Sequence, residues 1–392
     1  MQKMPMAMRS GMAAVLLTLL AAAAQAADPD FSPVHAQMQQ FVEQGQNTGI
    51  VTLVATKDKI LYEDAVGTSD GTRKAQKDDL FWIASMSKPI TALAAGILVD
   101  DGRLKWDDPV EKYIPEFKDM KVNGESLVRP IQLRDLLTHT SGLPEYSRTD
   151  PHWTLEQFAR QIASQGPRTQ PGARWSYSTA GIDAVGRVVE VASGMKFDEF
   201  LSQRLFEPVG MKDTSFWLSE ENAKRYSHTY VMNNQTQKLQ EQKISYFYGS
   251  DPTDKQRPPL GGAGLISTAQ DICRLYQMTM NNGKAGDKQI IKAETLKEML
   301  TPQTGNLRPG MPWGYGFAIM SDPKFLAGNA MLSPNSYGHG GAFGTNSWVD
   351  PKRGAIFVLM LERDRLQPSP DNSPMHIAFQ DAAVKAIDAA AK

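Results

Sequence analysis

The sequence predicts an α+β fold in which an antiparallel sheet flanked by helices is built from both chain ends. Two sets of apolar, β-rich runs, residues 50–67 and 344–361, are each interrupted by a polar turn, as in hairpins. Residues 103–260 between them hold short helical segments punctuated by Pro and Gly. We therefore expect a sheet domain formed by residues 27–102 and 261–392, with a mostly helical subdomain inserted at 103–260.

The N-terminal residues 1–26 have the pattern of a signal peptide. Lys3 and Arg9 form a short basic region, residues 11–24 are apolar, and Ala24 and Ala26 are small residues where a signal peptidase reads the chain. The apolar run is shorter than the roughly 20 residues that span a bilayer. We expect cleavage after Ala26 and export, periplasmic or secreted, without stable membrane insertion. An uncleaved anchor is the alternative.

The individual elements follow from local patterns. Residues 31–43 have the spacing of an amphipathic helix, and residues 50–67 form a hairpin around a polar turn. Residues 89–99 are apolar on every side and end at Asp-Asp-Gly, which predicts a central, buried helix. The insertion is expected to hold helices at 133–138, 155–164, 181–193 and 197–206, and a polar loop at 233–259. After it, helices are predicted at 269–281, 292–300 and 376–390, and strands at 313–320, 344–349 and 355–361.

The composition is that of a soluble globular chain. Of the 392 residues, 41% are hydrophobic and 22% charged, and the formal net charge is −1, so nothing indicates a nucleic-acid partner. The single cysteine, Cys273, excludes an intrachain disulfide and is expected to be a buried residue on a helix. No cluster of His, Cys, Asp or Glu has metal-ligand spacing. We expect neither a metal nor an organic cofactor, and the sequence does not indicate an oligomeric state.

Ser85 and Lys88 form an S-x-x-K motif at the start of the helix predicted at 89–99. Two further matches, at 193–196 and 321–324, lie at a helix end and in a turn, where no helix holds the lysine beneath the serine. Ser85 instead lies near the unpaired N–H groups of a helix start, with Lys88 on the same face. Apolar neighbours should lower the Lys88 pKa, so that this lysine can take the serine proton. The alternative is a serine N-cap followed by a surface lysine.

A second candidate is Tyr177, which follows a Pro-Gly turn and precedes a helix. There its hydroxyl can face a cleft, and if cations surround it, its pKa falls and it can shuttle protons. The alternative is a buried aromatic residue with a satisfied hydroxyl, the commoner fate of a lone tyrosine.

A third candidate is the segment His339-Gly340-Gly341-Ala342 at the start of a strand with edge character. Glycines allow a backbone to approach a ligand closely. The N–H of Ala342 could therefore join that of Ser85 in an oxyanion hole. The alternative is a glycine-rich turn.

Together, these sites resemble the serine β-lactamase and penicillin-binding-protein-like superfamily, whose pattern is S-x-x-K, then Y-x-N or Y-x-S, then K/H/W-x-G. The resemblance is greatest to the branch of class C β-lactamases, DD-carboxypeptidases, D-aminopeptidases and family VIII carboxylesterases. It covers nearly the whole chain after the signal peptide. The segments LLTHTSGLP (136–144), GGAGLISTAQD (261–271) and GHGGAFGTNSWVDP (338–351) are also similar to family segments.

The resemblance implies two-step acyl transfer without a cofactor. Ser85 would be the acylated nucleophile, and Lys88 its proton acceptor or the group that tunes it. Tyr177 would deprotonate Ser85 or protonate the leaving group, and later activate water. The N–H groups of Ser85 and Ala342 would form the oxyanion hole. The substrate would be bound by Thr179 and along an edge lined by His339, Gly340 and Gly341.

Two departures from the family pattern bear on the substrate. Thr179 stands where β-lactamases commonly have an asparagine that holds the lysine and a substrate amide, and His339 stands where many have lysine. Near neutral pH a histidine is mostly uncharged, so it holds a substrate carboxylate less firmly. A small ester or amide is therefore the expected substrate, with β-lactams and peptidoglycan stem peptides as alternatives. His139, in LLTHTSGLP, is expected to be structural.

Two competing functions are open to the chain. Ser69 lies in Gly-x-Ser-x-Gly, the pattern of an α/β-hydrolase nucleophile, but a charged loop follows it where that fold needs an apolar helix. The other is a penicillin-binding receptor that is acylated and does not turn over. For the expected acyl transfer on Ser85, the partner is a small-molecule or peptide acyl substrate.

Overall fold

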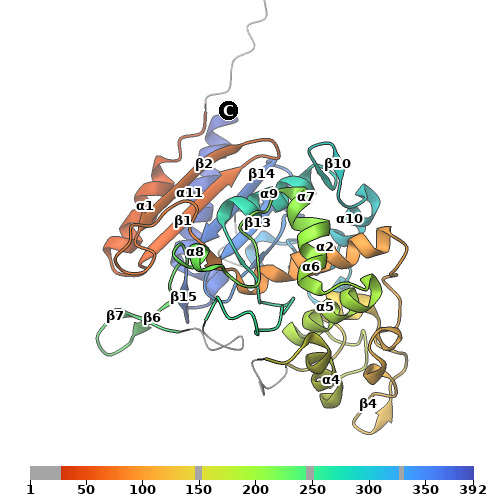
Figure 1. The fold of residues 1–392 in the computed structure, drawn as a ribbon. Coiled ribbons are helices and arrows are strands. Elements are labelled where there is room, and N and C mark those ends of the chain that lie inside the picture. Colours follow the sequence, from red (N-terminus) through yellow and green to blue (C-terminus); the bar gives the residue numbers. More distant parts are fainter. Residues whose placement is uncertain (1–27, 146–151, 244–250, 326–330) are drawn as a thin grey trace, which may run out of the picture.

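The computed structural model describes residues 28–145, 152–243, 251–325 and 331–392 (Figure 1). The predicted signal peptide lies outside these residues, so its cleavage stays a prediction. The helices are α1 (Ser32–Glu43), α2 (Ser87–Asp100), α3 (Leu133–Leu137), α4 (Leu155–Gln165), α5 (Thr179–Ser193), α6 (Phe197–Leu201), α7 (Glu207–Val209), α8 (Glu220–Ala223), α9 (Ala269–Met280), α10 (Ala293–Met299) and α11 (Pro374–Ala390). No helix in the described ranges has the length and apolar character to cross a membrane.

Six strands form an antiparallel sheet. In spatial order they are β11 (Ala318–Ile319), β12 (Tyr337–Gly340), β13 (Asn346–Asp350), β14 (Ala355–Met360), β1 (Gly49–Ala55) and β2 (Ile60–Gly67). Leu53, near the N-terminus, lies opposite Val358, near the C-terminus, and Figure 1 shows the red and blue strands side by side. The predicted sheet built from both chain ends is therefore confirmed.

The shorter strands lie outside this sheet. They are β3 (Phe81–Trp82), β4 (Lys121–Val122), β5 (Glu125–Ser126), β6 (Tyr230–Asn233), β7 (Lys238–Glu241), β8 (Ile266–Ser267), β9 (Lys284–Ala285), β10 (Lys288–Gln289) and β15 (Arg363–Asp364). The β6–β7 hairpin covers residues 230–241, so the first part of the polar loop predicted at 233–259 instead holds the strand β7, which pairs with β6. Strand β6 also pairs with β15 in parallel. The boundaries of the predicted insertion stay a prediction.

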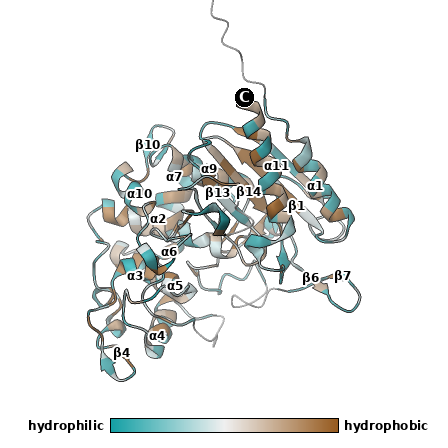
Figure 2. Ribbon diagram, turned by 180° about the vertical axis from the view of Figure 1, so that it is seen from behind, coloured by the Kyte–Doolittle hydropathy of each residue, from teal (hydrophilic) through white to brown (hydrophobic). Residues whose placement is uncertain are grey.

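The main sheet is covered by helices on both faces. Along β14, Ile356 and Val358 join one buried cluster with α2 and α9, whereas Phe357 and Leu359 join the other with α1 and α11. Figure 2 shows the hydrophobic strands β13 and β14 next to α11 and α1. Because alternate side chains are buried on opposite faces, these strands are apolar throughout.

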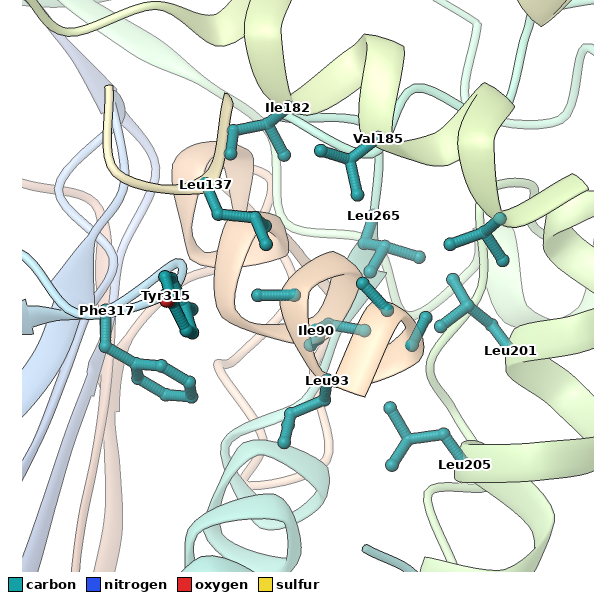
Figure 3. Close-up of a cluster of buried hydrophobic side chains, with 14 of the residues drawn as sticks. Ile90, Leu93, Leu137, Ile182, Val185, Leu201, Leu205, Leu265, Tyr315 and Phe317 are labelled. Atoms are coloured by element: carbon teal, nitrogen blue, oxygen red, sulfur yellow. The ribbon is translucent and has the colours of Figure 1, made fainter. Parts of the chain in front are cut away.

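Helix α2 lies at the centre of the molecule. Every residue from 87 to 98 is buried, and Figure 3 shows Ile90 and Leu93 among side chains of α3, α5 and the loop that carries Phe317. Full burial of each such side chain contributes about 1.5–3 kcal/mol. The prediction of a central, buried helix is confirmed, and this packing fixes the residues at its N-terminal end.

One predicted strand is largely a turn. Residues 313–320 were expected to be extended, but only Ala318 and Ile319 form β11. Gly316 has φ +76°, and a Cβ there would lie 2.3 Å from the Cβ of Ala92. The chain bends at Gly316 because it packs directly on α2, a contact that strand periodicity does not encode.

Candidate active site

The candidate nucleophile lies in a turn between β3 and α2. Ala84 has φ +44° and is fully buried, a left-handed conformation that costs roughly 1–2 kcal/mol and that only surrounding packing can hold. The next residue, Ser85, is partly exposed and lines a pocket. Helix α2 has Met86 as its N-cap residue, without a side-chain cap. Ser85 is therefore not an N-cap, which removes the alternative interpretation of this serine.

Lys88 is fully buried directly beneath Ser85. Its Nζ lies 3.0 Å from Ser85 Oγ and 3.4 Å from Thr179 Oγ1, and it donates a hydrogen bond to the carbonyl of Gly262 at 2.6 Å. A neutral amine can donate to Gly262 and Thr179 and still accept the proton of Ser85. The geometry thus suits a lysine that acts as a base.

Burial lowers the pKa of Lys88 to about 8, although the negative charges of Asp183 and Glu145 oppose the shift. Desolvation is the largest effect, and no ion pair of Lys88 with a carboxylate is found among the described residues. A neutral fraction therefore exists near neutral pH. This agrees with the sequence-based expectation of a lowered pKa.

Gly262 and Asp183 support the lysine, and both were missed by the sequence analysis. The Gly262 N–H donates to Asp183 Oδ1 at 2.7 Å. A Cβ at Gly262 would lie 2.6 Å from Thr179 Cγ2, so only glycine fits. The available signals were the Gly-Gly pair of residues 261–262 and a lone acid within the apolar helix α5.

Tyr177 precedes Ser178, the N-cap of α5, whose hydroxyl accepts from the Gly181 N–H at 3.1 Å. The centre of the Tyr177 ring is 4.8 Å from Lys88 Nζ. Burial raises the pKa of Tyr177 above its usual value, while a hydrogen bond with Ser85 opposes the shift. The charge of Arg308 does lower this pKa, but desolvation outweighs it, so the pKa is raised overall and Tyr177 is a neutral phenol.

His139 packs against Tyr177, with 4.5 Å between ring centres. It has φ +59°, and its Nδ1 accepts a hydrogen bond from the Ser178 N–H at 3.2 Å. Burial lowers its pKa well below the usual value, so the ring is neutral. These contacts connect His139 to the position of Tyr177.

His339 lies in β12, beside the two-residue strand β11. Its Nδ1–H donates to the Gly340 carbonyl at 2.7 Å, which leaves a lone pair on Nε2. That Nε2 is buried and has no hydrogen-bond partner among the described residues. Burial, reinforced by the charge of Lys88, lowers the pKa of His339 to about 3. The side chain is therefore an uncharged acceptor, which cannot attract a carboxylate.

The glycines after His339 are required by contacts within the protein. A Cβ on Gly340 would lie 1.9 Å from Asp371 Oδ1, and one on Gly341 would lie 2.6 Å from the Ile83 carbonyl. This close approach brings Ala342 beside the turn that carries Ser85, in the same pocket. In the described part of the chain, neither the Ala342 N–H nor the Ser85 N–H has a hydrogen-bond acceptor.

The pocket has a volume of about 300 Å³ and combines the three predicted sites with an aromatic wall. Lys88 and Thr179 are not among its lining residues, and Thr179 contacts Lys88. Several of its residues were missed. Trp175 lies two residues before Tyr177, and Trp348 lies on β13 within the family-like segment 338–351, but neither was singled out. The others come from segments outside the motifs and have no signal of their own: Arg308, Met311, Trp313, Pro370 and Asp371. No group of potential metal ligands is found in the ranges that the structure describes.

The competing residues lie elsewhere. Ser69 is buried and donates a hydrogen bond to Asp79. Ser193, at the end of α5, donates to the carbonyl of Glu190 at 3.4 Å. Cys273 is buried on α9 as predicted, and burial raises the pKa of its thiol to about 12. None of these residues lines the pocket of Ser85.

Comparisons with known proteins agree with this arrangement. The family model described as Beta-lactamase matches residues 34–382. Esterase EstB of Burkholderia gladioli is 29% identical over 379 residues, which cover 88% of this chain and 93% of that esterase. The structure of EstCE1, a hydrolase with promiscuous acyltransferase activity, has a TM-score of 0.76 at 23% identity, over 90% of this chain and 97% of its own. A penicillin-binding protein homologue from Caulobacter crescentus has a TM-score of 0.72 at 20% identity, over 91% and 97%. These two structures share the fold.

Proposed function

The chain belongs to the beta-lactamase family and is a serine hydrolase, and we propose that it cleaves small esters or amides through an acyl intermediate on Ser85. One observation carries the proposal: the fully buried Lys88 Nζ lies 3.0 Å from Ser85 Oγ, which faces the pocket. A partly neutral amine at this distance is placed to take the serine proton.

In acylation, neutral Lys88 takes the proton of Ser85 as Oγ attacks the substrate carbonyl carbon. At pH 7, a pKa of about 8 leaves roughly one lysine in ten neutral. The N–H groups of Ser85 and Ala342 stabilise the oxyanion that forms. Tyr177, a neutral phenol, gives its proton to the leaving group and regains one from the Lys88 ammonium. The leaving alcohol or amine departs, and the acyl group stays on Ser85.

Deacylation reverses these proton transfers. A water molecule replaces the leaving group and loses a proton through Tyr177 to Lys88 as it attacks the ester carbonyl. The Ser85 oxygen then recovers the proton from Lys88, and the carboxylic acid is released. Each proton is returned, so the cycle needs no other group.

The character of the pocket supports an ester or amide ahead of a β-lactam. His339 is neutral and presents a lone pair, so the position that many β-lactamases fill with lysine supplies no cation to a β-lactam carboxylate. Trp175, Trp313 and Trp348 supply apolar area for an acyl or alcohol group. The similarity to an enzyme named Esterase EstB supports the same choice. β-Lactam or stem-peptide hydrolysis, and acylation without turnover, are the alternatives.

The test is a substrate panel run on the wild type and on Ser85→Ala. It contains p-nitrophenyl esters, D-Ala-p-nitroanilide and nitrocefin. The proposal expects ester or amide turnover that disappears with Ser85. Nitrocefin turnover above that of every ester would favour a β-lactamase. A permanent penicillin adduct seen by intact mass, without turnover of any substrate, would favour the receptor.

We also propose that the protein is exported, on the basis of the sequence of residues 1–26 alone. Expression of the full chain in a Gram-negative host, followed by fractionation and N-terminal sequencing, tests this. A mature N-terminus at Ala27 in the periplasm or medium is expected. Retention of Met1 in the membrane fraction would indicate an anchor.

A further inference from the structure

Arg308 forms part of the pocket wall and is held by aromatic rings. Its guanidinium carbon lies 3.8 Å from the ring centre of Trp175 and 5.5 Å from that of Trp313. Trp175 and Trp313 line the same pocket as Ser85. Stacking on an indole restricts the plane of a guanidinium but leaves its N–H groups free to point elsewhere.

This arginine differs from the other buried or partly buried arginines because it donates to no described group, whereas Arg257 and Arg363, which also lack an ion pair, donate hydrogen bonds to the carbonyls of Phe216 and Gln46. Arg353 forms ion pairs with Asp350 and Asp388, and Arg129 forms one with Asp135. For Arg308, no hydrogen bond or ion pair with another described residue is found, and its Nε is buried and unpaired. Burial lowers its pKa, yet a guanidinium stays charged. A partly desolvated charge without a partner favours the entry of an anion.

The other polar groups of the pocket cannot take that role. His339 is an uncharged acceptor. Asp371 is itself an acid, so it cannot attract an anion. Its Oδ1 accepts a hydrogen bond from Asn346 at 3.0 Å and lies against Gly340. Asp371 and Arg308 interact electrostatically, and no ion pair between them is found among the described residues.

We propose that Arg308 is the anion-binding residue of this pocket and that the esters or amides it serves carry a free carboxylate. The inference rests on the proposed function and names its substrate class. The carboxylate binds to the guanidinium N–H groups and not at the position of His339, where many relatives carry a lysine. Arg308 thereby orients the substrate while Ser85 attacks the carbonyl of the ester or amide.

Two pairs of substrates test the proposal and locate the carboxylate. Mono-p-nitrophenyl glutarate carries it on the acyl side and is compared with its methyl ester. 4-Acetoxybenzoate carries it on the leaving group and is also compared with its methyl ester. In at least one pair, the wild type should prefer the acid, and Arg308→Met should lower the acid-to-ester ratio of kcat/KM by about 10- to 100-fold. Arg160→Met, at an arginine 58% exposed on α4, is the matched control and should leave that ratio unchanged.

The acidic neighbour supplies a second readout. Burial raises the pKa of Asp371 to about 6, opposed by Asn346 and Arg308; Tyr177 and His376 are the other titratable groups that interact with it. Above pH 6 its charge repels a substrate carboxylate. The KM for the acid should therefore fall relative to that for the methyl ester between pH 7 and pH 5, and Asp371→Asn should remove this change.

Binding measured without turnover separates this inference from the proposed function. Calorimetry on Ser85→Ala and on Ser85→Ala/Arg308→Met gives the Kd of each acid and its methyl ester. If Arg308→Met removes a preference for the acid, the inference stands even where the wild type hydrolyses nothing. Equal binding of acid and ester by Ser85→Ala, or an acid preference that persists without Arg308, would overturn it even where esters are hydrolysed.

Discussion

Lys88 Nζ lies 3.0 Å from Ser85 Oγ, and the lysine is fully buried although the serine reaches the pocket. Gly262 and Thr179 provide polar contacts for the amine, but no carboxylate forms an ion pair with it among the described residues. The same desolvation that weakens solvation of the ammonium makes the amine a usable base near neutral pH. Catalysis and stability are therefore coupled at this one side chain.

The pH dependence of ester hydrolysis should follow Lys88. Its folded pKa of about 8 means that the free base increases as the pH rises from 6 to 9, so kcat/KM should rise through a limb near pH 8. His139 and His339 are neutral throughout this range and should add no limb near 6.5. Initial rates with a neutral p-nitrophenyl ester measure this. A limb at 6.5, with none near 8, would assign the base to a histidine.

Removing the lysine should stabilise the fold at neutral pH. The pKa of Lys88 falls from 10.5 to about 8 on folding, so between these values the unfolded chain binds more protons and stability rises with pH. Below pH 8 the buried ammonium lowers the free energy of unfolding by the full amount, about 3 kcal/mol at 1.36 kcal/mol per pKa unit. Lys88→Met should lose turnover and gain up to this amount at pH 7, less the lost hydrogen bond to Gly262. Urea unfolding at pH 7 and pH 10 measures it, and a gain as large at pH 10 would contradict the burial argument.

Substitutions at the two candidate serines should have opposite effects, one on activity and the other on stability. Ser85→Ala should abolish hydrolysis and leave unfolding nearly unchanged, because its side chain is partly exposed. Ser69→Ala should keep turnover but cost about 1–3 kcal/mol, because it leaves the buried Asp79 with one hydrogen-bond donor fewer. Rates and urea midpoints of both variants are the measurements. Loss of turnover in Ser69→Ala alone would move the nucleophile to residue 69.

Removing the hydroxyl of Tyr177 should slow the reaction strongly and change the stability of the fold little. Tyr177→Phe keeps the ring that packs on His139 and removes the proton relay. We expect kcat to fall by about 10²–10⁴-fold, with a melting temperature close to that of the wild type. Stopped-flow and steady-state assays would show both acylation and deacylation slowed. Near-normal kcat in a folded Tyr177→Phe enzyme would exclude Tyr177 from proton transfer.

A cation at position 339 should change substrate preference. His339→Lys places an ammonium where a neutral lone pair now faces the pocket, so the KM for nitrocefin should fall relative to that for a neutral ester. His339→Gln keeps an uncharged acceptor and is the matched control. Relative KM values across pH 6–8 measure the effect. The same shift in both variants would mean that side-chain size, and not charge, controls the preference.

Several parts of the fold were accessible to sequence reasoning because they depend on neighbours along the chain. The buried α2 follows from an apolar pattern on every face, and the terminal strands follow from apolar runs around polar turns. The exceptions arise from contacts between distant segments. Gly316 turns because it packs on Ala92, so the strand predicted at 313–320 is mostly absent.

For the site, the residue types that could perform acyl transfer and their order along the chain follow from the sequence alone: Ser85 with Lys88, then Tyr177, then His339 to Ala342. Their protonation states depend on the folded chain, since the neutral His339 and the raised pKa of Tyr177 come from desolvation by distant segments. The tertiary structure also brought Arg308 and Asp371 into the pocket, from loops without a motif. Local spacing specifies chemistry that neighbours share, whereas burial and charge pairing depend on which remote residues meet.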